Sequence, residues 1–164
     1  MNLSEFNQAS AADAQRAISH CVALPDWAAS LVAARPWRSL EALLAVADGL
    51  AQRWDGVALS QALSAHPRIG ERAAGTGKEA QLSRQEQGEV NAADTALRQA
   101  LAAGNAAYER RFGRVFLIRA KGRSGEQMLA ELQRRLQNDM QQEQREAIDQ
   151  LREITLLRLK ESFL

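Results

Sequence analysis

Apolar residues recur along most of the chain at intervals of three and four positions. The clearest run lies between residues 40 and 54 and consists of Leu40, Leu43, Leu44, Ala47, Leu50, Ala51 and Trp54. This spacing puts the apolar side chains on one face of an amphipathic helix. Similar spacing over residues 90–101, 128–136 and 148–154 predicts three more helices of the same kind.

Prolines and glycines divide these helical runs. Pro25 and Pro36 bracket a short helical segment, and Gly104 and Gly113 stand where helix ends would be expected. The only continuous β-like run is "VFLI", residues 115–118, and a single short strand would have no partner. The pattern therefore predicts an all-α fold, a single compact domain over residues 1–164 with about seven or eight helices.

The weakest helical pattern covers residues 66–82, and a loop of that length in a compact domain is often functional. It begins with His66, followed by Pro67, which fixes its own φ and keeps the residue before it out of helical geometry. Histidine donates or accepts a proton near neutral pH, so His66 is a candidate catalytic residue. The same pattern is also typical of a histidine that only ends a helix.

A second candidate is the stretch "SRQEQ", residues 83–87. Ser83 and Glu86 have the spacing of a capping box, in which each side chain binds a backbone N–H group at a helix start. A helix start also attracts ligands that carry carboxylate or carbonyl oxygens. The local sequence is compatible with both a cap and a binding site.

The third candidate segment covers residues 110–127. Six basic residues occur in it without an intervening acid: Arg110, Arg111, Arg114, Arg119, Lys121 and Arg123. The glycine turn after the β-like run exposes backbone N–H groups that suit a small anion. RNA binding is an alternative, but the balance of 21 basic and 20 acidic residues gives it little support. Ser124 and Gln127 form a second capping-box pattern.

Arg158 falls on an apolar stripe that runs from Leu151 through Ile154. A guanidinium on a buried stripe needs a partner. That partner is either a carboxylate of the protein or the carboxylate of a substrate.

Other features narrow the function classes. Cys21 is the only cysteine, so no disulfide forms within the chain. No apolar run is long enough to span a membrane, and the first ten residues lack a secretory pattern, so we expect a cytoplasmic protein that binds neither membrane nor nucleic acid. We find no phosphate-loop, dinucleotide-binding or zinc-binding motif.

Five motifs occur together in one order: "AHPRIGE", "LSRQEQ", "NAAYERRFGRVFLIRAKGRS", "ELQRRLQN" and "EITLLRL". In this the chain resembles the family of 2-oxo-4-hydroxy-4-carboxy-5-ureidoimidazoline (OHCU) decarboxylases, which complete the route from urate to allantoin. The resemblance implies an all-helical homodimer that uses neither cofactor nor metal and produces (S)-allantoin. The rival hypothesis is a helical interaction module without enzymatic activity.

The resemblance also implies roles for particular residues. His66 and Glu86 would be catalytic, with His66 either donating the final proton or removing the hydroxyl proton that triggers loss of carbon dioxide. The residues expected to contact the substrate, besides Glu86, are Pro67, Ser83, Arg84, Gln85, Gln87, Ile118, Arg119, Ala120, Lys121, Gly122 and Arg158. Arg119 stands where many relatives have a small residue or cysteine, so we expect its side chain to point away. The enzyme hypothesis requires His66, Glu86 and residues 118–122 to meet in one pocket.

Overall fold

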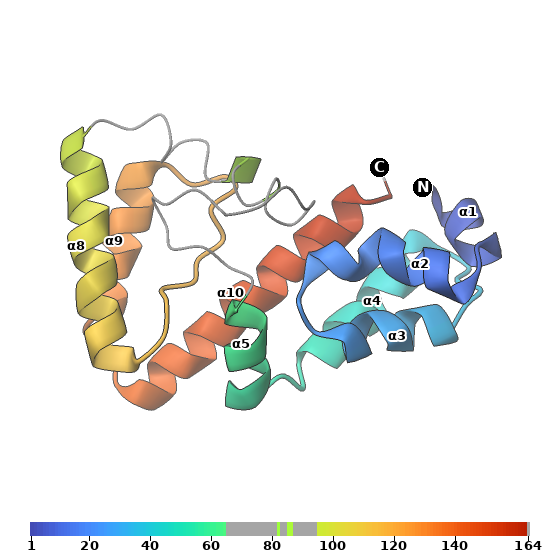
Figure 1. Ribbon diagram of the computed structural model, residues 1–164, viewed down its shortest axis with the longest axis horizontal. Helices are drawn as coiled ribbons and strands as arrows, with labels where there is room; N and C mark the ends of the chain where they lie inside the picture. Colours follow the sequence, from blue (N-terminus) through green and yellow to red (C-terminus); the bar gives the residue numbers. More distant parts are fainter. Residues whose placement is uncertain (65–81, 83–84, 87–94, 164) are drawn as a thin grey trace. The chain divides into compact units, whose positions relative to one another are not determined.

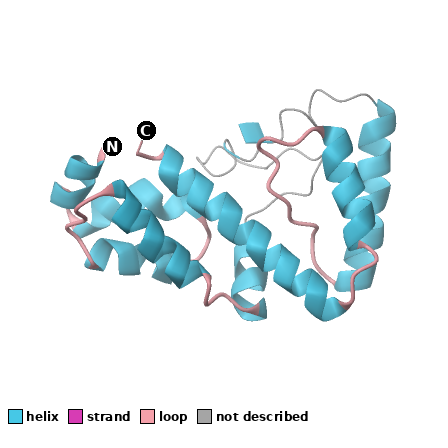
Figure 2. Ribbon diagram, turned by 180° about the vertical axis from the view of Figure 1, so that it is seen from behind, coloured by secondary structure: helices cyan, strands magenta, loops and turns pink. Residues whose placement is uncertain are grey.

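The computed structural model describes residues 1–64, 82, 85–86 and 95–163 (Figure 1). Within these residues the regular elements are eight α-helices and one 3-10 turn, and no strand occurs among them (Figure 2). The all-α prediction is thus confirmed. The elements are α1 (Leu3–Gln8), α2 (Ala11–Ile18), η1 (Ser19–Cys21), α3 (Pro25–Ala33), α4 (Leu40–Ala51), α5 (Gly56–Leu63), α8 (Thr95–Phe112), α9 (Gly125–Arg135) and α10 (Met140–Glu161).

Two compact units make up the chain. Unit 1 contains Met1–Ala62 and Arg152–Leu164, and unit 2 contains Leu63–Leu151. Each unit has buried side chains of its own. That residues 1–164 form a single domain stays a prediction.

In unit 1, α3 packs against both α2 and α4. Helix α3 begins at Pro25, whose missing N–H group costs nothing in the first turn of a helix. The helix predicted around residues 40–54 is α4, and it begins where the Ser39 side chain accepts a hydrogen bond from the backbone of Ala42 at 3.1 Å. The fully buried apolar side chains include Phe6, Ile18, Leu31, Leu43 and Leu59.

In unit 2, α8 and α9 lie side by side (Figure 1). Gly104 does not end a helix, as its sequence position suggested, but lies inside α8. A Cβ atom at this position would stand 2.5 Å from Cδ2 of Leu132 on α9, so the glycine allows the two helices to approach closely. A Cβ atom added to Gly125, at the start of α9, would likewise stand 2.6 Å from Cδ2 of Leu97 on α8.

The connection between α8 and α9 covers residues 113–124 and contains no regular element apart from turns. It begins at Gly113, which has a φ of +71° and ends α8 as the sequence predicts. Phe116 and Ile118 from this connection are buried in the core of unit 2. The "VFLI" run is therefore an irregular buried segment and not a strand.

No helix in the described residues is both long enough and apolar enough to cross a membrane.

Candidate functional site

A pocket of about 460 Å³ lies in unit 2 between the described part of the 83–87 stretch and the connection from α8 to α9. The described residues that line it are Gln85, Glu86, Ala120, Lys121, Gly122, Arg123 and Ser124. Gln85 and Glu86 have helical backbone geometry, with Gln85 exposed and Glu86 half-buried. The pocket thus has a carboxylate and a basic turn in its lining, although the two are distant in the sequence.

The basic side of the pocket is a tight turn. The N–H group of Arg123 donates to the carbonyl of Ala120 at 3.1 Å, which closes the turn around Lys121 and Gly122. Gly122 has a φ of +85°, a conformation that side chains with a Cβ disfavour. The glycine therefore sets the path of the backbone where it borders the pocket.

The start of α9 also borders the pocket. The predicted capping box is confirmed: the Ser124 hydroxyl accepts from the N–H of Gln127 at 3.1 Å, and the Gln127 side-chain carbonyl accepts from the N–H of Ser124 at 2.7 Å. The partial positive charge of a helix start adds to the charges of Lys121 and Arg123. The turn side is therefore suited to an anion, and the Glu86 carboxylate to a ligand that carries N–H donors.

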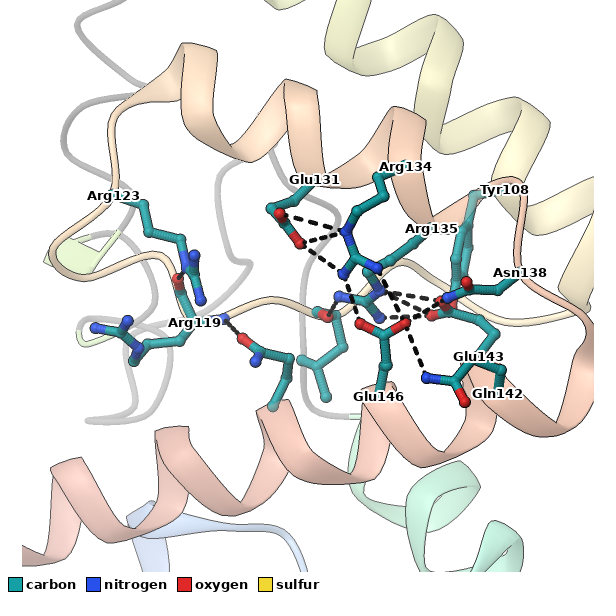
Figure 3. Close-up of polar contacts among 12 residues, drawn as sticks. Tyr108, Arg119, Arg123, Glu131, Arg134, Arg135, Asn138, Gln142, Glu143 and Glu146 are labelled. Carbon is teal, nitrogen blue, oxygen red and sulfur yellow. Dashed lines mark hydrogen bonds and ion pairs between the residues drawn. The ribbon is translucent and has the colours of Figure 1, made fainter.

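The backbone that leads into this turn is held by side chains (Figure 3). The carbonyl of Leu117 accepts from Nη1 of Arg135 at 2.8 Å. The N–H of Arg119 donates to Oε1 of Gln150 at 2.8 Å, and the carbonyl of Arg119 accepts from Nε of Arg123 at 2.9 Å. These bonds satisfy backbone groups for which a strand would use a neighbouring strand.

Arg135 belongs to a buried ion pair with Glu143. Nη2 of Arg135 lies 2.5 Å from Oε2 of Glu143, and the two side chains are 2% and 0% exposed. The Tyr108 hydroxyl donates to the same carboxylate, and burial and the neighbouring Glu143 raise the pKa of Tyr108, which keeps the phenol protonated. The Arg135 guanidinium also lies over the ring of Phe116 at 4.4 Å. This network anchors the connection to α8, α9 and α10.

A more exposed network of ion pairs and hydrogen bonds lies beside the buried pair (Figure 3). Nη2 of Arg134 contacts Glu146 at 2.5 Å and Glu131 at 2.8 Å. Hydrogen bonding to Arg134 lowers the pKa of Glu146 to about 2 and also lowers the pKa of Glu131. Asn138 links the two networks, because its amide donates to both Glu143 and Glu146.

The structure places some of the predicted site residues together. Gln85, Glu86, Ala120, Lys121 and Gly122 line the pocket. His66, Pro67, Ser83, Arg84 and Gln87 lie outside the described residues. Whether the described residues contact a substrate stays a prediction.

Two predicted contacts from the connection are not among the described lining residues. The side chain of Ile118 is buried in the core of unit 2. Nη1 of the Arg119 guanidinium donates to the carbonyl of Lys121 at 2.8 Å. That the Arg119 side chain points away from a bound ligand stays a prediction.

Arg158 belongs to unit 1, whereas the described pocket residues belong to unit 2. The side chain is buried, with 1% of the residue exposed, and Nη1 lies 3.5 Å from the carbonyl of Cys21. The expected burial of this guanidinium is thus confirmed, and its role as a carboxylate clamp stays a prediction. The other histidine, His20, is also buried in unit 1, where Nε2 lies 3.1 Å from the Ser162 hydroxyl.

In the sequence, Arg123 and Ser124 stand out only as a basic residue and a helix cap, and nothing there places them at the pocket. No sequence signal points to Gln150 or to the Arg135–Glu143 pair. Their positions on α9 and α10 look like those of ordinary charged or polar helix residues. Among the described side chains, no group of three or more histidines, cysteines, aspartates or glutamates is arranged to hold a metal ion.

A family model described as OHCU decarboxylase matches residues 7–160. A crystal structure of an OHCU decarboxylase in the presence of (S)-allantoin is 27% identical, with a TM-score of 0.74, and the match covers 88% of this chain and 95% of the other.

A crystal structure of an (S)-allantoin synthase is 16% identical, with a TM-score of 0.71 over 99% of this chain and 54% of the other, and so shows a likeness of fold. No curated protein matched.

Proposed function

The chain belongs to the OHCU decarboxylase family, and we propose that it binds its substrate in the pocket formed by Glu86 and residues 120–124. It is a carboxy-lyase that converts OHCU to allantoin in the degradation of urate. The observation that carries the proposed site is the position of Glu86 opposite the basic turn, in one pocket of about 460 Å³.

The chemistry of the substrate explains what such a pocket must do. The carboxylate that leaves is attached to the ring carbon that carries the hydroxyl, next to the C=N carbon that carries the ureido group. The electrons left behind delocalise into this C=N bond, and the hydroxyl carbon becomes part of an enol or enolate that one proton converts to allantoin. The protein has to hold the substrate, stabilise the developing negative charge and deliver one proton. Lys121, Arg123 and the start of α9 supply positive potential for the first two tasks. The Glu86 carboxylate accepts hydrogen bonds from the N–H groups of the ureido substituent and ring.

His66 supplies the proton step in this proposal, because it matches the histidine of the family motif. It either protonates the enolate or removes the hydroxyl proton before carbon dioxide leaves. Ser83, Gln87 and Pro67 complete the substrate contacts in this proposal. The family resemblance further supports a homodimer that works in the cytoplasm.

The test is a circular-dichroism time course on substrate generated in place from urate. The wild type is expected to produce the (S)-allantoin signal well above the spontaneous background. Glu86→Gln and His66→Ala are each expected to lose at least about a hundredfold in kcat/KM, because each removes a charge or a proton carrier at the reacting groups. Glu41→Gln, at an exposed position in the first turn of α4, serves as the control and should match the wild type.

A wild type no faster than the background would overturn the proposal. An active wild type with a fully active Glu86→Gln variant would keep the reaction but remove this pocket from it. Full activity of His66→Ala would instead remove His66 from the proton step.

A further inference from the structure

The residue before the turn at residues 120–123 is bound by a side chain from α10. Gln150 lies on α10 and is half-buried. Its Oε1 accepts the N–H of Arg119 at 2.8 Å, directly before Ala120, the first residue of the turn that lines the pocket.

This contact satisfies a backbone N–H group that a neighbouring strand would satisfy in a β-sheet. The connection of residues 113–124 passes the pocket without a regular ladder, so its backbone N–H and C=O groups need other partners. Arg135 binds the carbonyl of Leu117 further back, and Arg123 is part of the turn itself. Gln150 thus binds Arg119, the last residue before the turn, to α10, which is not part of the connection.

We propose that Gln150 is a positioning residue of the decarboxylase: it sets where residues 120–124 stand relative to Glu86. The inference rests on the proposed function, since it assigns this turn to substrate binding. Without the acceptor, the N–H of Arg119 has to find water, and the backbone at Ala120 shifts. Small displacements of a binding element are costly to catalysis because the reacting groups lose their alignment.

Three variants separate positioning from general stability. Gln150→Leu removes the acceptor and keeps the approximate size, and Gln150→Glu restores an acceptor oxygen. Gln142→Leu is the matched control, because Gln142 is also a part-buried glutamine of α10 but its side chain bonds to Glu146 and Arg145. For each variant we would measure kcat, KM, the melting temperature, and hydrogen exchange of the Arg119 amide by NMR.

We expect Gln150→Leu to lower kcat/KM by about tenfold, mostly through a higher KM, and to speed exchange of the Arg119 amide by a similar factor. Gln150→Glu should recover most of both quantities. Gln142→Leu should keep the kcat/KM and the Arg119 exchange rate of the wild type, whatever its melting temperature.

Two failures are distinguishable. If the wild type does not decarboxylate, the proposed function fails and the positioning role falls with it. If the wild type is active and Gln150→Leu keeps its kcat/KM, the proposed function stands and the positioning role is wrong. An equal loss of kcat/KM in Gln142→Leu would also overturn it, because the effect would then belong to α10 as a whole.

Discussion

The helix pair α3–α4 in unit 1 and the helix pair α8–α9 in unit 2 are packed in different ways. In α3 and α4 the buried residues include Trp27, Leu31 and Leu43, and the indole N–H of Trp27 donates to the carbonyl of Ala47 at 3.3 Å. Gly49 of α4 is exposed, and a Cβ atom added there would meet nothing within 4 Å. This pair has space for substitution on its exposed side.

Helices α8 and α9 leave less space for a larger side chain at their glycines. Gly104 and Gly125 allow close contact with leucines of the opposite helix, and the buried pair of Arg135 and Glu143 belongs to the same unit. Unit 2 also contains the irregular connection that lines the pocket, and its backbone is bound by side chains of Arg135 and Gln150. Charged side chains with several donors can bind the backbone of such a segment, and apolar side chains cannot.

The largest effect is expected at the buried ion pair. Glu143→Ala leaves the guanidinium of Arg135 buried without its carboxylate, and we expect a loss of about 3–5 kcal/mol in the free energy of unfolding. Urea unfolding measures this, with Glu41→Ala at an exposed position of α4 as the control. A loss below about 1 kcal/mol would mean that the pair does not anchor unit 2.

A smaller loss is expected at the contact between α8 and α9. The Cβ of Gly104→Ala would lie 2.5 Å from Cδ2 of Leu132, a side chain that is 0% exposed and so has to shift within the core. Overpacking of this kind costs about 1–3 kcal/mol, which exceeds the gain in helix propensity. Thermal unfolding should therefore show a lower melting temperature, and an increase would contradict the close approach.

The same substitution in unit 1 should have the opposite sign. Gly49→Ala adds a methyl group where nothing lies within 4 Å. We expect it to stabilise the protein by about 0.5–1 kcal/mol, because alanine loses less backbone entropy in a helix. If thermal unfolding shows both glycine variants to be stabilised or both destabilised, the contrast between the two helix pairs is wrong.

The smallest effect concerns the exposed network. Because Arg134 lowers the pKa of Glu146 from 4.5 to about 2, the stabilisation from ionised Glu146 is complete above pH 4.5 and is lost as the pH falls toward 2. Glu146→Gln should lower the free energy of unfolding by about 0.3–1 kcal/mol at neutral pH. The difference from the wild type should shrink in urea titrations at decreasing pH, and a constant difference would contradict this origin.

The periodic spacing predicts α4, α8, α9 and α10 because the buried faces of these helices repeat at the spacing of a helix turn. The short helix after Pro25 and the capping box at Ser124 are confirmed. The helix predicted over residues 40–54 is also present, but it ends at Ala51, so Trp54 lies beyond it. These features depend on local sequence. Gly104 was predicted wrongly, since a glycine that ends a helix and a glycine that permits close packing look the same in one dimension.

In the candidate site, too, local features are visible in the sequence and long-range contacts are not. Glu86 and the glycine turn at Gly122 were singled out because capping patterns and glycines are visible in the sequence. Gln150 and the Arg135–Glu143 pair were not, because their roles depend on which residues of other elements they meet. Long-range contacts of this type leave no periodic signal.

The most direct test of the account is a crystal structure of this protein with (S)-allantoin. The account predicts the ligand within hydrogen-bonding distance of the Glu86 carboxylate and of the turn at residues 120–124, with the Arg119 N–H still bound to Gln150. A ligand bound at another place, with Glu86 and this turn facing only solvent, would contradict it.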